Sequence, residues 1–205
     1  MVARTDHKII YKLIEDNSSV LDIGCGGGRL LSLLKKKKNI TLNGIDIDSE
    51  KVGKALSKGF NVIQGDADND LHYYGNKRFD YAILCQTSQV TKNPKQVIEQ
   101  AMRIANKVII VIPNFGYIQN RFYLGIKGKM PVTKDLSFAW YETPNIHFCT
   151  ITDMYHLLKK ELKYKILNKY YIIRKTTIPF FSDGRFIPNL FGKYGVFVVE
   201  EGKVL

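Results

Sequence analysis

The stretch Val20-Leu-Asp-Ile-Gly-Cys-Gly-Gly-Gly28 decides the fold class of this 205-residue chain. Its apolar beginning predicts a buried strand at 20–23, and its glycines at 24, 26 and 28 predict a tight turn leading into a helix at about 29–37. Glycine adopts backbone conformations that other residues avoid, and its missing Cβ lets a ligand lie against the turn. Such a turn can also have a purely structural role. The flanking sequence is therefore needed to distinguish a ligand-binding turn from a structural one.

The spacing of these glycines restricts the ligand. The dinucleotide-binding fingerprint GxGxxG would need a glycine at position 29, where this chain has Arg29. The pattern GxGxG therefore argues against a ligand that contains a pyrophosphate. It is compatible with a nucleoside-type ligand that needs close backbone contact but no phosphate cradle.

Short apolar runs alternate with amphipathic stretches on both sides of the turn, which predicts βα units and a parallel sheet. Further strands are expected at 40–46, 61–64, 79–85 and 107–112, and helices at 6–16, 49–58 and 94–104. A helix at 152–162 and strands at 170–174 and 195–200 would complete the chain. The expected fold class is therefore α/β, with a mostly parallel seven-stranded sheet and an antiparallel strand near the C-terminus.

No linker or shift in composition divides the chain, so residues 1–205 are expected to form a single domain. The segment at about 114–148 interrupts the alternation and is rich in aromatic residues and glycine. We interpret it as an insertion over the carboxyl edge of the sheet, because long loops in compact domains are often functional. Its aromatic residues could line an acceptor pocket, belong to the core or contact a partner protein.

Two further acidic residues strengthen the ligand-binding interpretation. Asp46 should lie at the end of the second strand, where its carboxylate could accept hydrogen bonds from both hydroxyls of a ribose. Asp66 should lie just beyond the third strand, where it could accept from the exocyclic amine of an adenine. Each acid alone could merely cap a helix or form a turn. Together with Asp22 they predict a nucleoside-binding edge of the sheet.

The order VLDIGCGGG, GIDID, QGDAD and FDYAIL resembles the signature series of class I S-adenosylmethionine (SAM)-dependent methyltransferases. This resemblance implies a Rossmann-like methyltransferase fold that binds SAM or its product S-adenosylhomocysteine. It also assigns the parts of the cofactor to individual residues. The methionine portion would contact Asp22, Gly24, Gly26 and Gly28; the ribose would contact Asp46 beside Ile47; and the adenine would contact Asp66 and Ala67.

A narrower resemblance extends over nearly the whole chain and is weakest from about 155 to 205. The strings CQTSQ, IPNFG, GKMPVT and WYETPNIHFCT are similar to those of the bacterial MetW family of methionine biosynthesis proteins. That resemblance implies a cytoplasmic protein that acts with a homoserine O-acyltransferase. One departure is Gly27, where the family usually has an acidic residue.

Catalysis itself is left open by the sequence, and so is the methyl acceptor. Candidate acceptor contacts lie after the fourth strand and in the insertion: Gln86, Gln89, Asn114, Tyr141, Asn145 and His147. His147 is the best general base by its chemistry, although a lone histidine among apolar residues is often structural. The alternative to an accessory role is an active SAM-dependent methyltransferase that modifies an unidentified small molecule.

The net charge of +12 could indicate an RNA substrate, but 24 of the 31 basic residues are Lys, and Arg is the usual bidentate phosphate ligand. A lysine-rich solvated surface explains the charge better than a nucleic-acid groove does, so we do not expect a nucleic-acid partner. Three scattered cysteines and four scattered histidines predict neither a disulfide framework nor a metal site. No apolar run is long enough to predict a membrane span.

Overall fold

A single eight-stranded sheet dominates the computed structural model, which describes residues 4–132, 139–143 and 147–202. The strands are β1 (Ser19–Ile23), β2 (Thr41–Asp46), β3 (Asn61–Gln64), β4 (Phe79–Cys85), β5 (Ala105–Pro113), β6 (Lys165–Ile173), β7 (Thr176–Pro179) and β8 (Tyr194–Glu200). Their order across the sheet is β3-β2-β1-β4-β5-β8-β6-β7. The chain therefore reverses its direction of growth between β3 and β4, and the carboxyl ends of β1 and β4 meet at that point.

Strands β1 to β5 are parallel, which confirms the predicted α/β class. Strand β8 is inserted antiparallel between β5 and β6. The prediction of seven strands omitted β7, which pairs antiparallel with β6 at the edge of the sheet. The two strands are joined by a tight turn in which Arg174 has a φ of +52°. No glycine or asparagine marks that turn, so its sequence gave no signal.

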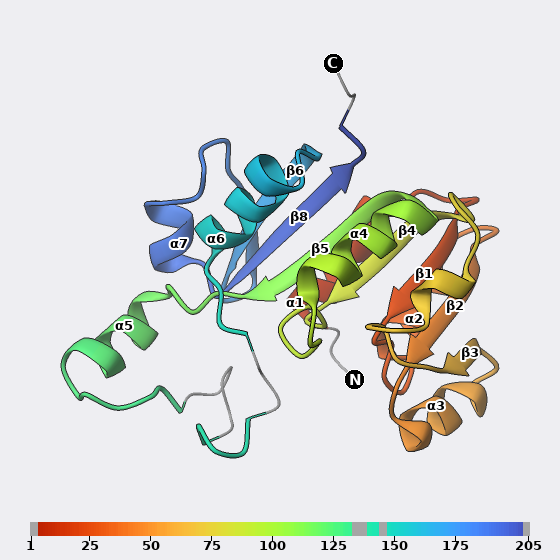
Figure 1. Ribbon diagram of the computed structural model, residues 1–205, viewed down its shortest axis with the longest axis horizontal. Coiled ribbons are helices and arrows are strands. Elements are labelled where there is room, and N and C mark those ends of the chain that lie inside the picture. The colour runs from red at the N-terminus through yellow and green to blue at the C-terminus, as the bar shows by residue number, and fades with distance from the viewer. Residues whose placement is uncertain (1–3, 133–138, 144–146, 203–205) are drawn as a thin grey trace.

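Helices cover both faces of the sheet (Figure 1). The α-helices of the described residues are α1 (Thr5–Leu13), α2 (Arg29–Leu34), α3 (Ser49–Leu56), α4 (Pro94–Ile104), α5 (Ile118–Gly125), α6 (Ile151–His156) and α7 (Ile187–Phe191). A short 3₁₀ helix, η1 (Leu71–Tyr73), precedes β4, and a π-helical turn, η2 (Leu157–Glu161), extends α6. Among these described helices, none is both long and apolar enough to cross a lipid bilayer.

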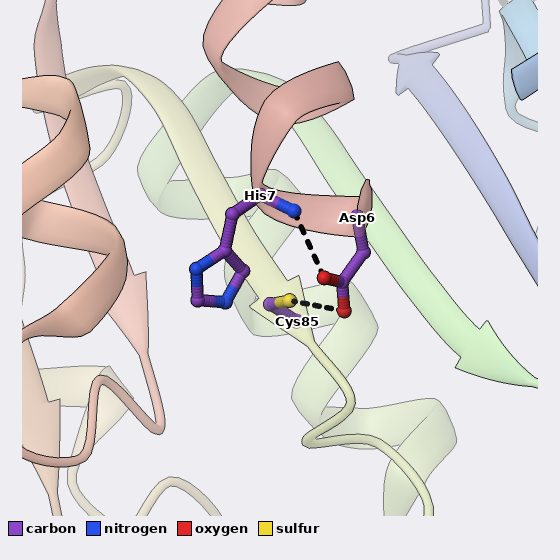
Figure 2. Close-up of side chains that lie close together, drawn as sticks. All are labelled: Asp6, His7 and Cys85. Carbon is purple, nitrogen blue, oxygen red and sulfur yellow. Dashed lines mark hydrogen bonds between the residues drawn. The ribbon is translucent and has the colours of Figure 1, made fainter. Parts of the chain in front are cut away.

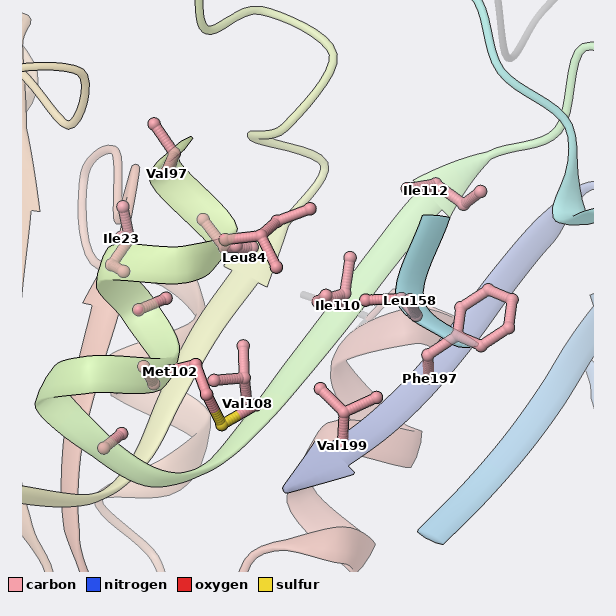
Figure 3. Packing of buried hydrophobic residues seen from close by; sticks show 14 of the residues in the cluster. Ile23, Leu84, Val97, Met102, Val108, Ile110, Ile112, Leu158, Phe197 and Val199 are labelled. Carbon is pink, nitrogen blue, oxygen red and sulfur yellow. The ribbon is translucent and has the colours of Figure 1, made fainter. Parts of the chain in front are cut away.

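Alternating residues of the central strands supply the two halves of the core. In β5, Val108, Ile110 and Ile112 face α4 and α6, whereas Ile109 and Val111 face the layer of α1 and α2. Figure 3 shows the first of these layers, where α4 packs over β4 and β5 and Phe197 of β8 extends the apolar contacts. This two-sided burial explains the continuous apolar runs of the central strands.

The insertion begins at the carboxyl end of β5. No helix was predicted there, yet the structure has α5, which extends away from the sheet in Figure 1 and does not cover its edge. Only Asn120 is buried among the residues of α5. The segment returns to the body of the protein at His147, whose backbone N–H donates to the Gln89 carbonyl at 3.1 Å.

Candidate functional site

The glycine turn after β1 is held in left-handed backbone conformations. Gly24, Gly26 and Gly28 have φ values of +78°, +54° and +71°. A Cβ on Gly24 would lie 2.6 Å from the Thr87 hydroxyl oxygen, and one on Gly28 would lie 2.9 Å from the Phe60 ring. A Cβ on Gly26 would have no neighbour closer than the Lys51 side chain at 3.9 Å, so of these three glycines Gly26 leaves the most room for a ligand. The other two glycines serve the packing of the turn against the protein.

Asp46 connects the end of β2 to this turn. One of its carboxylate oxygens accepts from the Gly26 backbone N–H at 2.7 Å, and the other accepts from the Asp48 backbone N–H at 3.0 Å. Each carboxylate oxygen has a second lone pair, so both remain able to accept from a ligand hydroxyl. Asp46 is therefore fixed in orientation at the place where the sequence predicted a ribose contact.

Asp66 lies in a tight turn after β3. Its carboxylate accepts from the Asp68 backbone N–H and from the Asn69 side-chain amide, each at 2.9 Å. The carboxylate of Asp70 in turn accepts from the Asp66 backbone N–H at 2.7 Å. These bonds fix the backbone of Asp66 and Ala67 beside the cavity described next.

A cavity of about 420 Å³ lies at the carboxyl edge of the sheet. Its lining brings together residues from the glycine turn, the ends of β2 and β3 and the loop after β4. They are Gly24, Gly26, Ile45, Asp46, Ile47, Lys51, Gly65, Asp66, Ala67, Asp68, Gln86, Thr87, Val90, Thr91 and Lys92. Six of the eight predicted cofactor contacts thus share one cavity: Gly24, Gly26, Asp46, Ile47, Asp66 and Ala67. Gly28 does not line it.

Asp22 lines a second cavity of about 420 Å³ on the other side of the glycine turn. Gly24, Gly26 and Lys51 line both cavities, so the two adjoin. Asp22 is only 2% exposed, and its carboxylate has no hydrogen-bond partner among the described residues. Burial, together with the nearby charge of Asp46, raises the pKa of Asp22 to about 7. A buried carboxylate without a partner is the group that a bound cation would stabilise most.

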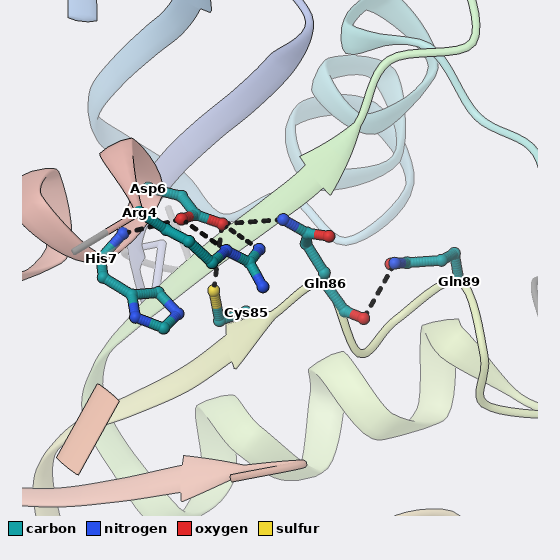
Figure 4. Close-up of polar contacts among 6 residues, drawn as sticks. All are labelled: Arg4, Asp6, His7, Cys85, Gln86 and Gln89. Carbon is teal, nitrogen blue, oxygen red and sulfur yellow. Dashed lines mark hydrogen bonds and ion pairs between the residues drawn. The ribbon is translucent and has the colours of Figure 1, made fainter. Parts of the chain in front are cut away.

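A polar network from α1 closes this second cavity, and sequence analysis did not assign it to the site (Figure 4). Asp6 is paired with Arg4 and accepts a hydrogen bond from the Gln86 side-chain amide at 2.7 Å. Arg4 and His7 line the cavity together with Cys85 at the end of β4. The signal was present, because Asp6 and His7 lie on the buried face of α1 that also carries Ile9 and Ile10.

The protonation states in this network differ sharply from one residue to the next. Burial by itself would raise the pKa of Asp6, but the bonded Arg4 guanidinium lowers that pKa below its ordinary value. Burial lowers the pKa of His7 and raises the pKa of Cys85 well above its ordinary value. At neutral pH Asp6 is therefore ionised, His7 is neutral and Cys85 is a thiol.

Asp6, His7 and Cys85 also form a group of potential metal ligands, with ligand atoms that all lie within 4.8 Å of one another (Figure 2). The Cys85 thiol points to the Asp6 carboxylate at 3.8 Å. A metal ion would have to remove the thiol proton and would compete with the Arg4 guanidinium for the same carboxylate. The contacts of the group therefore fit a polar network better than a metal centre.

Of the candidate catalytic residues Gln86, His147 and Tyr141, the first two lie at the first cavity and the third does not. Gln86 lines the first cavity and has a φ of +60°. The His147 ring contacts the Lys92 carbonyl at 3.3 Å, at the rim of that cavity. Tyr141 is exposed in the insertion. Of the other acceptor candidates, Asn114 is buried beneath α5, and Asn145 lies outside the described residues.

Comparison with solved structures defines the class of protein. The chain is similar to a SAM-dependent methyltransferase of Thermotoga maritima, described as a possible histamine N-methyltransferase, with a TM-score of 0.72 and 17% identity over 96% of this chain and 88% of that one. It is also similar to a SAM-dependent methyltransferase of Archaeoglobus fulgidus, with a TM-score of 0.67 and 17% identity over 97% and 91% of the two chains. The fold is thus that of the class I SAM-dependent methyltransferases.

Sequence comparison then defines the family. Residues 4–199 match the family model of the methionine biosynthesis protein MetW, and the chain belongs to the MetW family. It is 32% identical over 162 residues to the bifunctional methionine biosynthesis protein MetXA/MetW of Rhodopirellula baltica. That match covers 75% of this chain but only 26% of the Rhodopirellula protein. The chain is therefore a methyltransferase-like protein associated with methionine biosynthesis.

Proposed function

We propose that this protein binds SAM or S-adenosylhomocysteine across the two adjoining cavities and acts in the cytoplasm with a homoserine O-acyltransferase. The observation that carries the proposal is the common cavity formed by the glycine turn, Asp46 and the Asp66–Ala67 turn. In doubly wound sheets, ligands bind at the carboxyl ends of the strands where the chain reverses direction. The cavity occupies that position in this sheet.

The lining of the first cavity is suited to an adenosyl group. Asp46 and Asp66 offer fixed carboxylates, while Ile47, Ala67 and Val90 offer apolar surface for a base. Pockets of this kind combine apolar walls with a few oriented polar groups. We assign the ribose to Asp46 and Ile47, and the adenine to Asp66 and Ala67.

The second cavity is suited to an amino-acid moiety, since its wall contains both signs of charge. The unpaired Asp22 carboxylate would hold an ammonium group. Arg4, Arg29 and Lys51 would hold a carboxylate. The methionine portion of SAM carries both groups, so these residues fit the cofactor, and Gly26 lies between the two cavities without a side chain.

The partnership is supported by the composition of the Rhodopirellula relative, whose name joins MetXA to MetW in one polypeptide. Joining two proteins in one chain raises their effective concentration and favours pairs that work in contact. In this role the cofactor acts as a regulatory ligand and is not consumed. The three cysteines, Cys25, Cys85 and Cys149, are free thiols, which suits a reducing compartment.

Isothermal titration with SAM and with S-adenosylhomocysteine tests the proposal. We expect saturable binding of at least one of the two, weakened by roughly tenfold or more in Asp46→Asn, because hydrogen bonds to charged groups contribute about 1.5–3 kcal/mol. The matched control is Asp48→Asn, two residues further along, because Asp48 caps α3 and asparagine caps a helix equally well. Equal affinity in the Asp46 and Asp48 variants would contradict the site.

A second candidate function is methyl transfer to an unidentified small molecule. It is favoured by the size of the second cavity, which extends beyond the glycine turn to His7 and Cys85 and leaves room for an acceptor. Incubating the protein with SAM labelled in the methyl group and a metabolite extract would detect the transfer. Labelled product that disappears in Asp46→Asn would support this function, and the absence of product would favour the regulatory role.

A further inference from the structure

Helix α5 presents an apolar surface that no part of the described chain covers. Ile118, Phe122 and Leu124 on this helix are exposed, and Ile126, at its end, is 73% exposed. Aromatic and aliphatic side chains of this size are normally placed in a core. Contiguous apolar patches on a soluble protein usually mark an interaction site.

A second apolar surface lies at the same end of the molecule, around α7. Phe181 is 92% exposed, Phe186 is 76% exposed and Ile187 is 60% exposed. In Figure 1, α5 and α7 both lie beyond the ends of β5 and β8, at the opposite end of the molecule from α3. The cofactor cavities are elsewhere, because their lining comes from the glycine turn, β2, β3 and the loop after β4.

Three buried asparagines connect the bases of the two helices. The Asn114 side-chain amide donates to the carbonyls of Asn189 and Gly192 at 2.8 and 2.7 Å. The Asn120 side chain of α5 donates to the Asn114 carbonyl at 3.3 Å. The Asn189 side chain of α7 accepts from the Ile151 backbone N–H at 3.2 Å. Because these bonds are buried, they fix the base of α5 to the base of α7, so the two apolar surfaces lie at the same end of the molecule; together they are called the α5–α7 face.

Lysines flank this face. The Lys127 ammonium lies 4.4 Å from the centre of the Tyr123 ring, and the Lys169 ammonium lies 4.6 Å from the Tyr155 ring and 5.2 Å from the Phe180 ring. Lys127 can contact a partner while its stem covers apolar surface, whereas the Lys169 ammonium already donates to the Phe181 carbonyl at 3.0 Å and holds that segment in place. Since the whole chain carries a net charge of +12, two copies repel one another at long range. An acidic partner is attracted instead.

We propose that the α5–α7 face, formed by Ile118, Phe122, Ile126, Phe181, Phe186 and Ile187, is the docking surface for the homoserine O-acyltransferase. It binds an apolar depression on that enzyme that is bordered by acidic side chains. This proposal depends on the partnership proposed above and adds the surface through which the two proteins would bind. Aromatic residues, Phe among them, are enriched at protein interfaces relative to the rest of the surface.

The test measures binding of the full-length protein to the homoserine O-acyltransferase of the same organism by biolayer interferometry. One variant carries Phe122→Glu and Phe186→Glu, which place a charge on each half of the face. The matched control carries Leu56→Glu and Ile63→Glu, at two similarly exposed apolar positions on α3 and β3. Thermal unfolding and SAM titration establish that both variants are folded, since neither alters a residue that lines either of the two cavities at the carboxyl edge of the sheet.

We expect the face variant to bind the enzyme roughly 30-fold more weakly or worse, the size of a hot-spot loss, and the control to bind like the unaltered chain. Binding should also weaken with added salt, because the partner surface is acidic. Equal binding by all three proteins would overturn the surface assignment and leave the partnership intact. No binding by the unaltered chain would overturn the partnership itself.

Two further measurements decide between other occupants of the face. Sedimentation of the protein alone should show a monomer that the face variant does not alter. A dimer that the face variant abolishes would assign the face to a second copy of this chain. Binding to vesicles of anionic phosphatidylglycerol that the face variant abolishes would assign it to a membrane. Either result would overturn the proposal.

Discussion

At the β1–β3 end of the sheet, charged residues are buried and face a cavity, whereas at the β6–β7 end large apolar residues are exposed to solvent. Asp22 illustrates the first region, with a carboxylate that is 2% exposed and has no partner among the described residues. Phe181 illustrates the second, with a ring that is 92% exposed. Each arrangement is unfavourable for the isolated chain.

The two regions differ in the kind of binding partner that would stabilise them. A small cationic ligand in the cavity would stabilise the buried carboxylate, while a large apolar partner would cover the exposed rings. We therefore propose a ligand site in the first region and a protein interface in the second. The following substitutions test whether the two regions differ in this way.

Gly24→Ala should have the largest effect. The left-handed backbone at Gly24 disfavours any side chain, and the new Cβ would meet the buried Thr87 side chain, which is itself bonded to the Ile23 carbonyl at 2.8 Å. We expect a loss of about 4 kcal/mol in the free energy of unfolding, from about 1–2 kcal/mol of backbone strain and about 1–3 kcal/mol of overpacking. Urea denaturation measures it. A loss below 1 kcal/mol would contradict the packing described for the turn.

Asn114→Ala tests the base of the second region. It removes the donor for the Asn189 and Gly192 carbonyls and the acceptor for the Gly116 backbone N–H at 3.0 Å. Each buried group left without a partner costs about 1–3 kcal/mol, so we expect a loss of about 3 kcal/mol. Hydrogen exchange should be faster in α5 and α7 than in α3. Uniform acceleration over the whole chain would contradict a local connection between the two helices.

Asp22→Asn should produce a pH-dependent gain in stability. In the native state the pKa of Asp22 is raised to about 7, so its favourable contribution is complete below pH 4 and is lost as the pH rises through 7. Asparagine does not ionise, so the stability of the variant should not fall as the pH rises through 7. We expect the variant to be more stable than the unaltered chain at pH 8, by up to about 4 kcal/mol for a pKa raised from about 4 to about 7, and similar in stability at pH 4.

Chemical denaturation at several pH values, without cofactor, measures the difference for Asp22→Asn. The same substitution should weaken SAM binding, since the amide cannot pair with an ammonium group. A stability gain that did not change with pH would mean that Asp22 does not titrate between those values. Unaltered SAM affinity would mean that Asp22 does not contact the cofactor.

Gly53→Ala should have the smallest effect, and it has the opposite sign to Gly24→Ala. Gly53 lies inside α3 on its exposed side, and no atom lies within 4 Å of a Cβ placed there. Alanine should stabilise the protein by about 1 kcal/mol through its higher helix propensity. The midpoint of thermal unfolding measures the gain. A loss of stability would show that the helix requires glycine at this position.

The first region was largely predictable because its residues follow their strands directly in sequence. Asp46 and Asp66 are placed by the ends of β2 and β3, and the glycine turn by the end of β1. The contact between Asp6 and Gln86 was not predictable, because 80 residues separate them and only the folded chain brings them together. The only indication was that Asp6 and His7 lie on the same face of α1 as the apolar Ile9 and Ile10.

The second region was harder to predict because its signals are non-local. Helix α5 is short and its apolar residues face solvent instead of the sheet, so a pattern that relies on burial in the core did not predict it. Strand β7 follows a turn at Arg174 that lacks the usual turn residues. The residues of a binding surface are complementary to the partner protein. The sequence of one chain carries no information about that partner, so its hydrophobic pattern cannot predict such a surface.

A crystal structure of the protein with bound S-adenosylhomocysteine would test whether the cofactor occupies the two cavities beside the glycine turn. We predict the ribose hydroxyls within hydrogen-bonding distance of the Asp46 carboxylate, the adenine beside Ile47 and Ala67, and the amino group beside Asp22. A ligand bound elsewhere, or one in the cavity that leaves Asp22 and Asp46 without contact, would contradict the account.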